Sequence, residues 1–209
     1  AVAHRAAASN TAITRYAPVS AAGFLLKNEI EYFNKAMKNP SRPLVAIIGG
    51  AKVSDKIKLL ENIIDNVDCL LVGGGMAFTF LKADGFNVGK SICENDMLEL
   101  ARQIMAKAKA KNVRFLLPED TIIAQAPSAD AERNIVAIKD IPEGWMGLDI
   151  GPRTIAAFSE VVSKAKTVVW NGPLGMFEIA AFSSGTFKLV DAVVESGALS
   201  IVGGGDTDT

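Results

Sequence analysis

The chain has 209 residues, of which 49% are hydrophobic and 22% are charged, and its formal net charge is -1. This composition is typical of a soluble globular protein with a large core. The balanced charge excludes bulk attraction to nucleic acid or to an acidic membrane. The sequence contains no signal peptide, no apolar run long enough to span a bilayer and no low-complexity segment. We therefore expect a cytoplasmic protein that uses neither nucleic acid nor membrane as a partner.

Residue types that build metal sites and catalytic triads are scarce. The two cysteines, Cys69 and Cys93, lie in an apolar strand pattern and beside a helix start, which favours reduced thiols over a disulfide or a metal site. The single histidine, His4, excludes a His-rich metal site. Any chemistry must therefore depend on lysines, carboxylates and backbone groups.

The start of the chain predicts a helix that leads into the first strand. The sequence begins abruptly at Ala1, without a methionine or a capping signal, so we expect a fragment of a longer protein. Apolar residues recur at helical spacing over residues 20–38, and Asn39 and Pro40 end the pattern. Arg5 fits either an anion site or a solvated terminus.

From residue 42 onward, short apolar runs alternate with helical patterns. Strands are expected at 44–48, 68–72, 113–118, 167–170 and 199–202, and helices at 57–67, 76–85, 94–111, 152–165 and 179–196. Residues 121–140 read as a small antiparallel excursion. The expected fold class is α/β: a doubly wound, mostly parallel, Rossmann-like sheet with helices on both faces, plus that excursion.

The stretch 49–56 (GGAKVSDK) lies between the first of these strands and its helix. Glycines let a backbone approach a ligand closely, and free N–H groups at a helix start attract anions. Lys52 and Lys56 are four residues apart, so they face the same side of the first helical turn. The stretch indicates a polyphosphate site, although its spacing matches neither a P-loop nor a G-x-G-x-x-G fingerprint. A tight turn with two solvated lysines is the alternative.

Four expected strands end in glycine-rich turns, at 49–50, 73–75, 171–173 and 203–205. Because ligands of open parallel sheets bind at the carboxyl ends of the strands, these turns indicate one shared site. The alternative explanation is tight strand-to-helix packing at each turn. The uncharged turn at 73–75 suits a flat adenine ring better than a phosphate.

Two carboxylates complete the expected site. Asp206 follows three glycines and suits Mg²⁺, which prefers a few carboxylates together with phosphate oxygens. Asp206 also suits a helix N-cap, and the two roles are compatible. Glu178 can accept hydrogen bonds from ribose hydroxyls, or it is an ordinary surface glutamate.

Five motifs, in order along nearly the whole chain, resemble those of phosphoglycerate kinase, in particular its C-terminal, nucleotide-binding domain. They are residues 49–56 (GGAKVSDK), 73–77 (GGGMA), 145–152 (WMGLDIGP), 169–173 (VWNGP) and 203–207 (GGGDT). The opening 3–6 (AHRA) is similar to the end of the family's N-terminal domain. The resemblance implies phosphoryl transfer between 1,3-bisphosphoglycerate and MgADP, giving 3-phosphoglycerate and MgATP in glycolysis.

The resemblance also implies roles for individual residues. Lys52, Lys56, Gly204 and Gly205 would act in catalysis, Asp206 would hold the metal, and Arg5 would contact 3-phosphoglycerate. The implied nucleotide contacts are Gly49, Gly50, Ala51, Lys56, Gly73, Gly74, Asn171, Pro173, Glu178, Gly204, Gly205, Asp206 and Thr207. In-line transfer of this kind depends on positioning and charge neutralisation more than on a general base.

Departures from the family pattern limit what the resemblance predicts. Ala7 stands where family members often carry a second polar residue, commonly His, and 207–209 (TDT) lacks the usual small apolar residues. We expect residues 1–18 to be the end of the N-terminal domain and hinge. Residues 19–209 would be the nucleotide-binding domain, led by a long interdomain helix and truncated at its C-terminus. A monomer is expected.

Two other functions remain open at this point. Because most of the acid-binding half is missing, the chain by itself is expected not to catalyse transfer. It could then serve as a stand-alone nucleotide-binding module. A nicotinamide dehydrogenase is disfavoured, because G-x-G-x-x-G is absent and hydride transfer does not need the two turn lysines.

Overall fold

A computed structural model describes residues 8, 12–28, 31 and 40–203, and the chain divides into two units, residues 1–40 and 41–209. In the first unit, one 3-10 turn, η2 (Ile13–Arg15), precedes helical residues 24–28 and 31. None of the described residues of this unit is buried. The helix expected over 20–38 begins at Phe24, and of its positions 29–30 and 32–38 lie outside the described residues.

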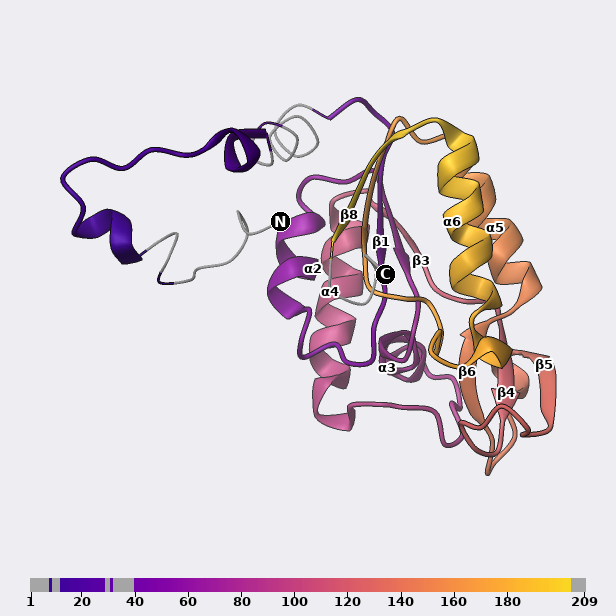
Figure 1. The fold of residues 1–209 in the computed structure, drawn as a ribbon. Helices are drawn as coiled ribbons and strands as arrows, with labels where there is room; N and C mark the ends of the chain where they lie inside the picture. The colour runs from indigo at the N-terminus through magenta and orange to yellow at the C-terminus, as the bar shows by residue number, and fades with distance from the viewer. Residues whose placement is uncertain (1–7, 9–11, 29–30, 32–39, 204–209) are drawn as a thin grey trace. The chain divides into compact units, whose positions relative to one another are not determined.

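The second unit is built on a five-stranded sheet in the order β3-β2-β1-β7-β8 (Figure 1). Its strands are β1 (Leu44–Ile48), β2 (Cys69–Val72), β3 (Arg114–Leu116), β7 (Thr167–Asn171) and β8 (Leu199–Gly203). Every neighbouring pair is parallel. All five residues of β1 are buried, as expected for a central strand covered on both faces.

Helices cover the two faces of this sheet in two groups (Figure 1). One group comprises α2 (Ile57–Ile63), α3 (Met76–Ala83) and α4 (Leu98–Ala110), the last preceded by the 3-10 turn η3 (Asn95–Met97). The other comprises α5 (Pro152–Ser163) and α6 (Ser184–Ser196), which lie side by side. The expected doubly wound α/β fold is confirmed. Its strand order reverses between β1 and β7, where such folds bind ligands.

A three-stranded antiparallel sheet confirms the expected excursion and extends it. Its centre is β4 (Asp120–Ala124), flanked by β5 (Arg133–Ala137) and β6 (Met146–Ile150), and β5 leads into the 3-10 turn η4 (Ile138–Asp140). The sequence interpretation assigned no strand to the residues of β6. A small core of Phe78, Leu81, Val88, Ile123, Ile138 and Ile141 joins this sheet to α3.

Two helices are shorter than their apolar patterns predicted. The expected helix 57–67 ends at Ile63, since the N–H groups of both Asn66 and Val67 bond to the carbonyl of Ile63 in a turn. The helix expected from residue 179 begins at Ser184, after the 3-10 turn η5 (Ala180–Phe182). Apolar periodicity continued through both turns, so it could not mark these helix ends.

A buried carboxylate of the antiparallel sheet starts helix α5. Oδ1 of Asp120, which is 2% exposed, accepts hydrogen bonds from Thr154 N at 2.8 Å and from Thr154 Oγ1 at 2.6 Å. Its Oδ2 accepts from Arg153 N at 3.0 Å. A carboxylate satisfies the free N–H groups of a first helical turn and is favoured there by the helix dipole. This contact therefore joins the antiparallel sheet to the helix layer of the parallel sheet.

The loops that follow β1, β2 and β7 pack backbone against backbone. Gly49 N donates to Asn171 O at 2.9 Å, Gly50 N to Pro173 O at 2.9 Å, and Gly74 N to Leu174 O at 3.0 Å. A Cβ added to Gly49 would overlap the carbonyl oxygen of Pro173 and lie 2.7 Å from that of Gly172.

A Cβ added to Gly74 would meet the same layer of backbone. It would lie 2.7 Å from both N and O of Gly50 and 2.8 Å from the carbonyl oxygen of Pro173. Tight packing therefore explains these glycines, but the packing joins loop to loop rather than strand to helix. Loop-to-loop packing is compatible with a shared ligand site, because it brings the three loops together at one edge of the sheet.

Replacing Gly49 with alanine should destabilise the fold, because the new methyl group meets backbone that cannot rotate away. We expect the free energy of unfolding to fall by about 2–4 kcal/mol, measured by urea denaturation. Gly203→Ala is the matched control, since among the described residues its Cβ would meet only Asn171 Nδ2, at 3.6 Å. Equal stabilities for the two variants would contradict this account.

Candidate functional site

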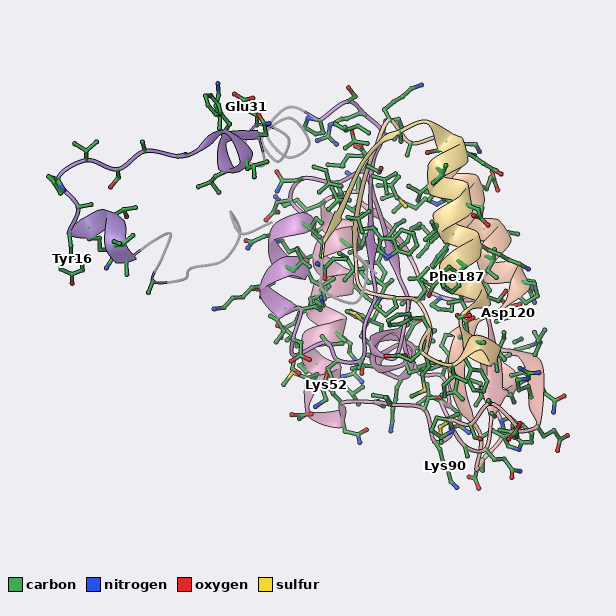
Figure 2. All side chains as sticks on the ribbon, in the orientation of Figure 1. Tyr16, Glu31, Lys52, Lys90, Asp120 and Phe187 are labelled. Atoms are coloured by element: carbon green, nitrogen blue, oxygen red, sulfur yellow. The ribbon has the colours of Figure 1, made fainter. Side chains whose placement is uncertain are left out.

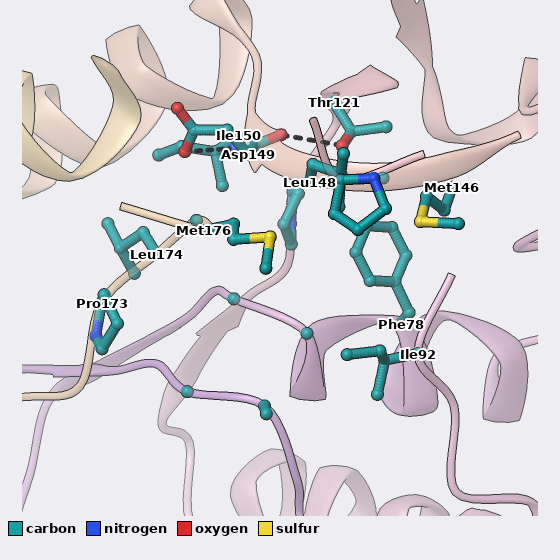
Figure 3. A pocket seen from close by; sticks show the side chains of 18 of the residues that line it. Phe78, Ile92, Thr121, Met146, Leu148, Asp149, Ile150, Pro173, Leu174 and Met176 are labelled. Atoms are coloured by element: carbon teal, nitrogen blue, oxygen red, sulfur yellow. Dashed lines mark hydrogen bonds between the residues drawn. The ribbon is translucent and has the colours of Figure 1, made fainter. Parts of the chain in front are cut away.

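A cavity of about 460 Å³ opens between the glycine loops and the antiparallel sheet. Gly50, Ala51 and Gly74, from the loops after β1 and β2, line one side of it, the floor. The opposite wall is lined by residues of strand β6: Met146, Leu148, Asp149 and Ile150 (Figure 3). The cavity lies at the carboxyl ends of β1, β2 and β7, beside the point where the strand order reverses. This is the place where doubly wound folds bind their ligands.

Seven of the residues predicted to contact the nucleotide lie at or behind the cavity. Five of them line the cavity: Gly50, Ala51, Gly74, Pro173 and Glu178. Gly49 and Gly73 instead lie behind it, packed on Pro173 and on the side chain of Leu174. These two glycines shape the floor without lining it.

The predicted cations lie along the same edge of the sheet. Lys56, half-buried, donates from Nζ to Asn171 Oδ1, so a residue of the first loop and a predicted residue of β7 form a direct pair. Lys56 also lies beside Gly50, whose Cβ would be 3.7 Å from Lys56 Cε. Lys52 is exposed at the end of the unit where the strands terminate (Figure 2). The structure therefore places positive charge next to the cavity floor.

Much of the cavity wall was missed by the sequence interpretation. The missed residues are mainly apolar: Phe78, Ile92, Thr121, Met146, Leu148 and Met176 (Figure 3). Phe78 is buried, whereas Ile92 and Met176 are 55% and 37% exposed at the mouth. Apolar side chains left exposed around a cavity are typical of a binding site for an apolar or aromatic group. The motif 145–152 was the available signal, but no residue of it was assigned to the site.

Asp149 is a buried acid in the cavity wall. Its Oδ1 accepts from Ile150 N at 2.9 Å and its Oδ2 accepts from Gly185 N, at the start of α6, at 2.7 Å. Burial raises the pKa of Asp149 to about 7, against the opposing effect of these two N–H donors. Thr121 Oγ1 donates to the Asp149 carbonyl at 2.8 Å, which ties β4 to the same point.

Several predicted site residues lie outside the described residues: Arg5, Gly204, Gly205, Asp206 and Thr207. The strand that leads to four of them is described. Gly203 pairs with Asn171 in the register of β7 and β8, so β8 ends beside the residue that holds Lys56.

Two further features are absent from the described residues. Residues 8, 12–28, 31 and 40–203 contain no cluster of three or more His, Cys, Asp and Glu side chains that could hold a metal ion. Over the same ranges, no helix has the length and apolar character needed to cross a membrane.

The fold and the cavity together define a class of protein. A doubly wound α/β unit presents an apolar cavity whose floor is glycine backbone and whose edge carries lysines. An apolar slot beside a basic edge matches a molecule with a flat ring at one end and anionic groups at the other.

Comparison with known proteins identifies the family within this class. The family model described as phosphoglycerate kinase matches residues 1–209, and the chain belongs to this family, as its motifs predicted. The chain is 59% identical to the phosphoglycerate kinase of Citrifermentans bemidjiense over 208 residues, which cover 100% of the chain and 52% of that protein. It is 50% identical to that of Finegoldia magna, covering 98% and 51%.

Solved structures show the same relationship. The structure of phosphoglycerate kinase from Coxiella burnetii superposes with a TM-score of 0.93 at 50% identity, covering 99% of this chain and 53% of that one. The enzyme from Pyrococcus horikoshii gives 0.74 at 29% identity, covering 98% and 52%. The chain spans about half the length of the relatives it matches.

Asp149 should make stability depend on pH. The folded chain holds this proton up to a pKa of about 7, whereas the unfolded chain releases it near 3.8. Between these values the folded state binds more protons, so the contribution of Asp149 to stability is fully present below pH ~4 and is lost as pH rises through ~7. From pH 5 to pH 8 we expect wild type to lose about 2–3 kcal/mol relative to Asp149→Asn, measured by urea denaturation. Parallel pH profiles for the two proteins would rule this out.

Proposed function

We propose that this chain supplies the nucleotide-binding half of a phosphoglycerate kinase, which transfers a phosphoryl group between 1,3-bisphosphoglycerate and MgADP. One observation carries the proposal: the apolar cavity is lined by Gly50, which lies beside Lys56, and by Pro173, two residues after the Asn171 that pairs with Lys56. A nucleotide has the matching polarity, with a flat base at one end and phosphates at the other.

Each part of a nucleotide has chemically suited partners. The base fits against the backbone of Gly50, Ala51 and Gly74 on one side and Leu148 on the other. Glu178, exposed at the cavity, suits the ribose hydroxyls. The phosphates would extend toward Lys56. The glycines permit this close approach because they carry no side chain.

In the proposed reaction, a β-phosphate oxygen of ADP attacks the phosphorus of the acyl phosphate. The new P–O bond forms as the bond to the carboxyl oxygen breaks, and 3-phosphoglycerate leaves as a carboxylate. Lys52 and Lys56 would neutralise charge on the transferring oxygens, with Gly204 and Gly205 contributing backbone N–H groups. Arg5 would bind 3-phosphoglycerate.

A carboxylate beside the phosphates of a bound nucleotide would suit Mg²⁺. Mg²⁺ is commonly held by one or two carboxylates together with substrate phosphates. Asp206, three residues beyond the end of β8, would supply the carboxylate, and Gly203 brings that strand end beside Asn171. Bound there, the ion would neutralise phosphate charge.

Nucleotide binding without catalysis is the second candidate for the chain by itself. The observation that favours it is that the chain aligns with only about half of the length of each relative. The remaining half of the relatives would then have to supply the acid-binding part.

Calorimetric titration of the chain with ADP tests the nucleotide site. We expect saturable binding that Mg²⁺ tightens and that Lys56→Ala weakens by about 10- to 100-fold, through loss of a charge-assisted phosphate contact. Lys58→Ala is the matched control, because Lys58 is an exposed lysine of α2. A folded chain without measurable ADP binding, or equal effects of the two substitutions, would overturn the proposed function.

The chain by itself should not turn over substrate. We expect no ATP formation above background in a coupled assay with 1,3-bisphosphoglycerate and MgADP, even at concentrations that saturate ADP binding. In-line transfer requires both substrates to be held in one geometry. Measurable turnover by the purified chain would show that it carries a complete acid site.

A further inference from the structure

Glu94 is a charged side chain that neither the sequence interpretation nor the proposed reaction uses. It lies just before η3, in the segment that connects α3 to α4. Its own N–H donates to Thr79 Oγ1 at 3.1 Å, and Thr79 is 1% exposed. The next residue, Asn95, accepts from Lys82 Nζ at 2.8 Å through Oδ1. The backbone of Glu94 is therefore anchored to α3.

From this anchor the carboxylate reaches the loop that carries the two lysines. Glu94 Oε2 accepts from Ser54 N at 3.1 Å, and Glu94 Oε1 accepts from Ser54 Oγ at 2.5 Å. Burial acts to raise the pKa of Glu94, but hydrogen bonds from Ser54 and Val53 and the charge of Lys52 lower it overall. The carboxylate is thus charged at neutral pH and bonded to the centre of the loop.

The loop needs such a contact because its centre is exposed. Ala51, Lys52, Ser54 and Asp55 are exposed, and Val53 is the buried residue among them. No side chain caps α2, which begins immediately after Lys56. Within the described part of the chain, the side-chain hydrogen bonds to residues 51–55 come from Glu94.

The two ends of the loop are held by other contacts. Gly50 is fixed by its bond to Pro173 O and by Met76 N, which donates to Gly50 O at 2.9 Å. Lys56 is fixed by Asn171. Lys52 lies between these points, next to the buried Val53 and two residues from Ser54, so among the described residues the contact with Glu94 is the side-chain hydrogen bond nearest to it along the chain.

We propose that Glu94 is a positioning residue: it clamps the loop through Ser54 so that Lys52 is held where the phosphates of the nucleotide bind. The inference rests on the proposed function for the identity of the ligand, whereas the clamp itself is a property of the free chain. A pre-positioned cation stabilises phosphate charge without the cost of ordering the loop during binding.

Glu94 also has an electrostatic effect that weakens ADP binding, and a test of the clamp must distinguish the two effects. Its negative charge near Lys52 repels phosphate, so removing the charge alone should leave ADP binding unchanged or slightly tighter. Glu94→Gln removes the charge and keeps an oxygen that can accept from Ser54. Glu94→Ala removes both the charge and the hydrogen bonds. The difference between these variants isolates the clamp.

Titrations of the 209-residue chain with MgADP and with AMP test the inference. We expect Glu94→Ala to bind ADP about 5- to 10-fold more weakly than Glu94→Gln, while AMP affinity stays within about twofold, because AMP lacks the β-phosphate. Glu99→Ala and Glu99→Gln are matched controls, since Glu99 is exposed on α4 and pairs with Arg102 at 3.2 Å. Equal ADP affinities for the two Glu94 variants would overturn the positioning role.

Hydrogen exchange tests the clamp without any ligand. In Glu94→Ala the amide of Ser54 should exchange at least about tenfold faster than in wild type, with β1 amides unchanged. Unchanged exchange at Ser54 would overturn the inference even if ADP binds normally. If no nucleotide binds but exchange at Ser54 rises, the clamp stands and the proposed function fails.

Discussion

The close approach of three backbone loops is the constraint on which the site depends. The turns after β1, β2 and β7 share hydrogen bonds and contact each other where side chains are absent, at Gly49, Gly74 and Gly172. Because no Cβ separates them, the carboxyl ends of three parallel strands converge on one small area. The cavity floor is therefore backbone, whose N–H and C=O groups are present whatever side chain a residue carries. Its geometry is set by main-chain packing.

The opposite wall depends on buried carboxylates. Asp120 and Asp149 belong to the antiparallel sheet, yet they accept hydrogen bonds from the first turns of α5 and α6. Two helices of the parallel sheet thus begin against side chains of the second sheet, which fixes β6 over the glycine loops. An antiparallel hairpin with one additional strand has little core of its own, so these contacts give the wall its position. Burial raises the pKa of Asp149 to about 7, so at neutral pH part of this acid is held in its uncharged form within the apolar wall.

The positive charge at the cavity edge depends on how individual lysines are held, and not on the net charge of the chain. Lys56 is held by the neutral Asn171, and the loop that carries Lys52 is held by Glu94. Both arrangements leave cationic groups available to an anionic ligand while restricting where they lie. A chain with a net charge of -1 can therefore present a local basic edge.

The sequence by itself determined the fold class and the family, and it predicted the sheet edge where the cavity lies, because these depend on local patterns: apolar runs, glycine turns and ordered motifs. It could not mark the end of α2 or the start of α6, since apolar periodicity continued through the adjoining turns. Tertiary structure decided which glycines pack and which line the cavity, as Gly49 and Gly50 are neighbours with different surroundings. It also decided that Phe78, Ile92 and Met146 form one wall, and that Glu94 meets Ser54. Phe78 and Met146 are distant in the chain, as are Glu94 and Ser54, and only tertiary packing brings the members of each pair together.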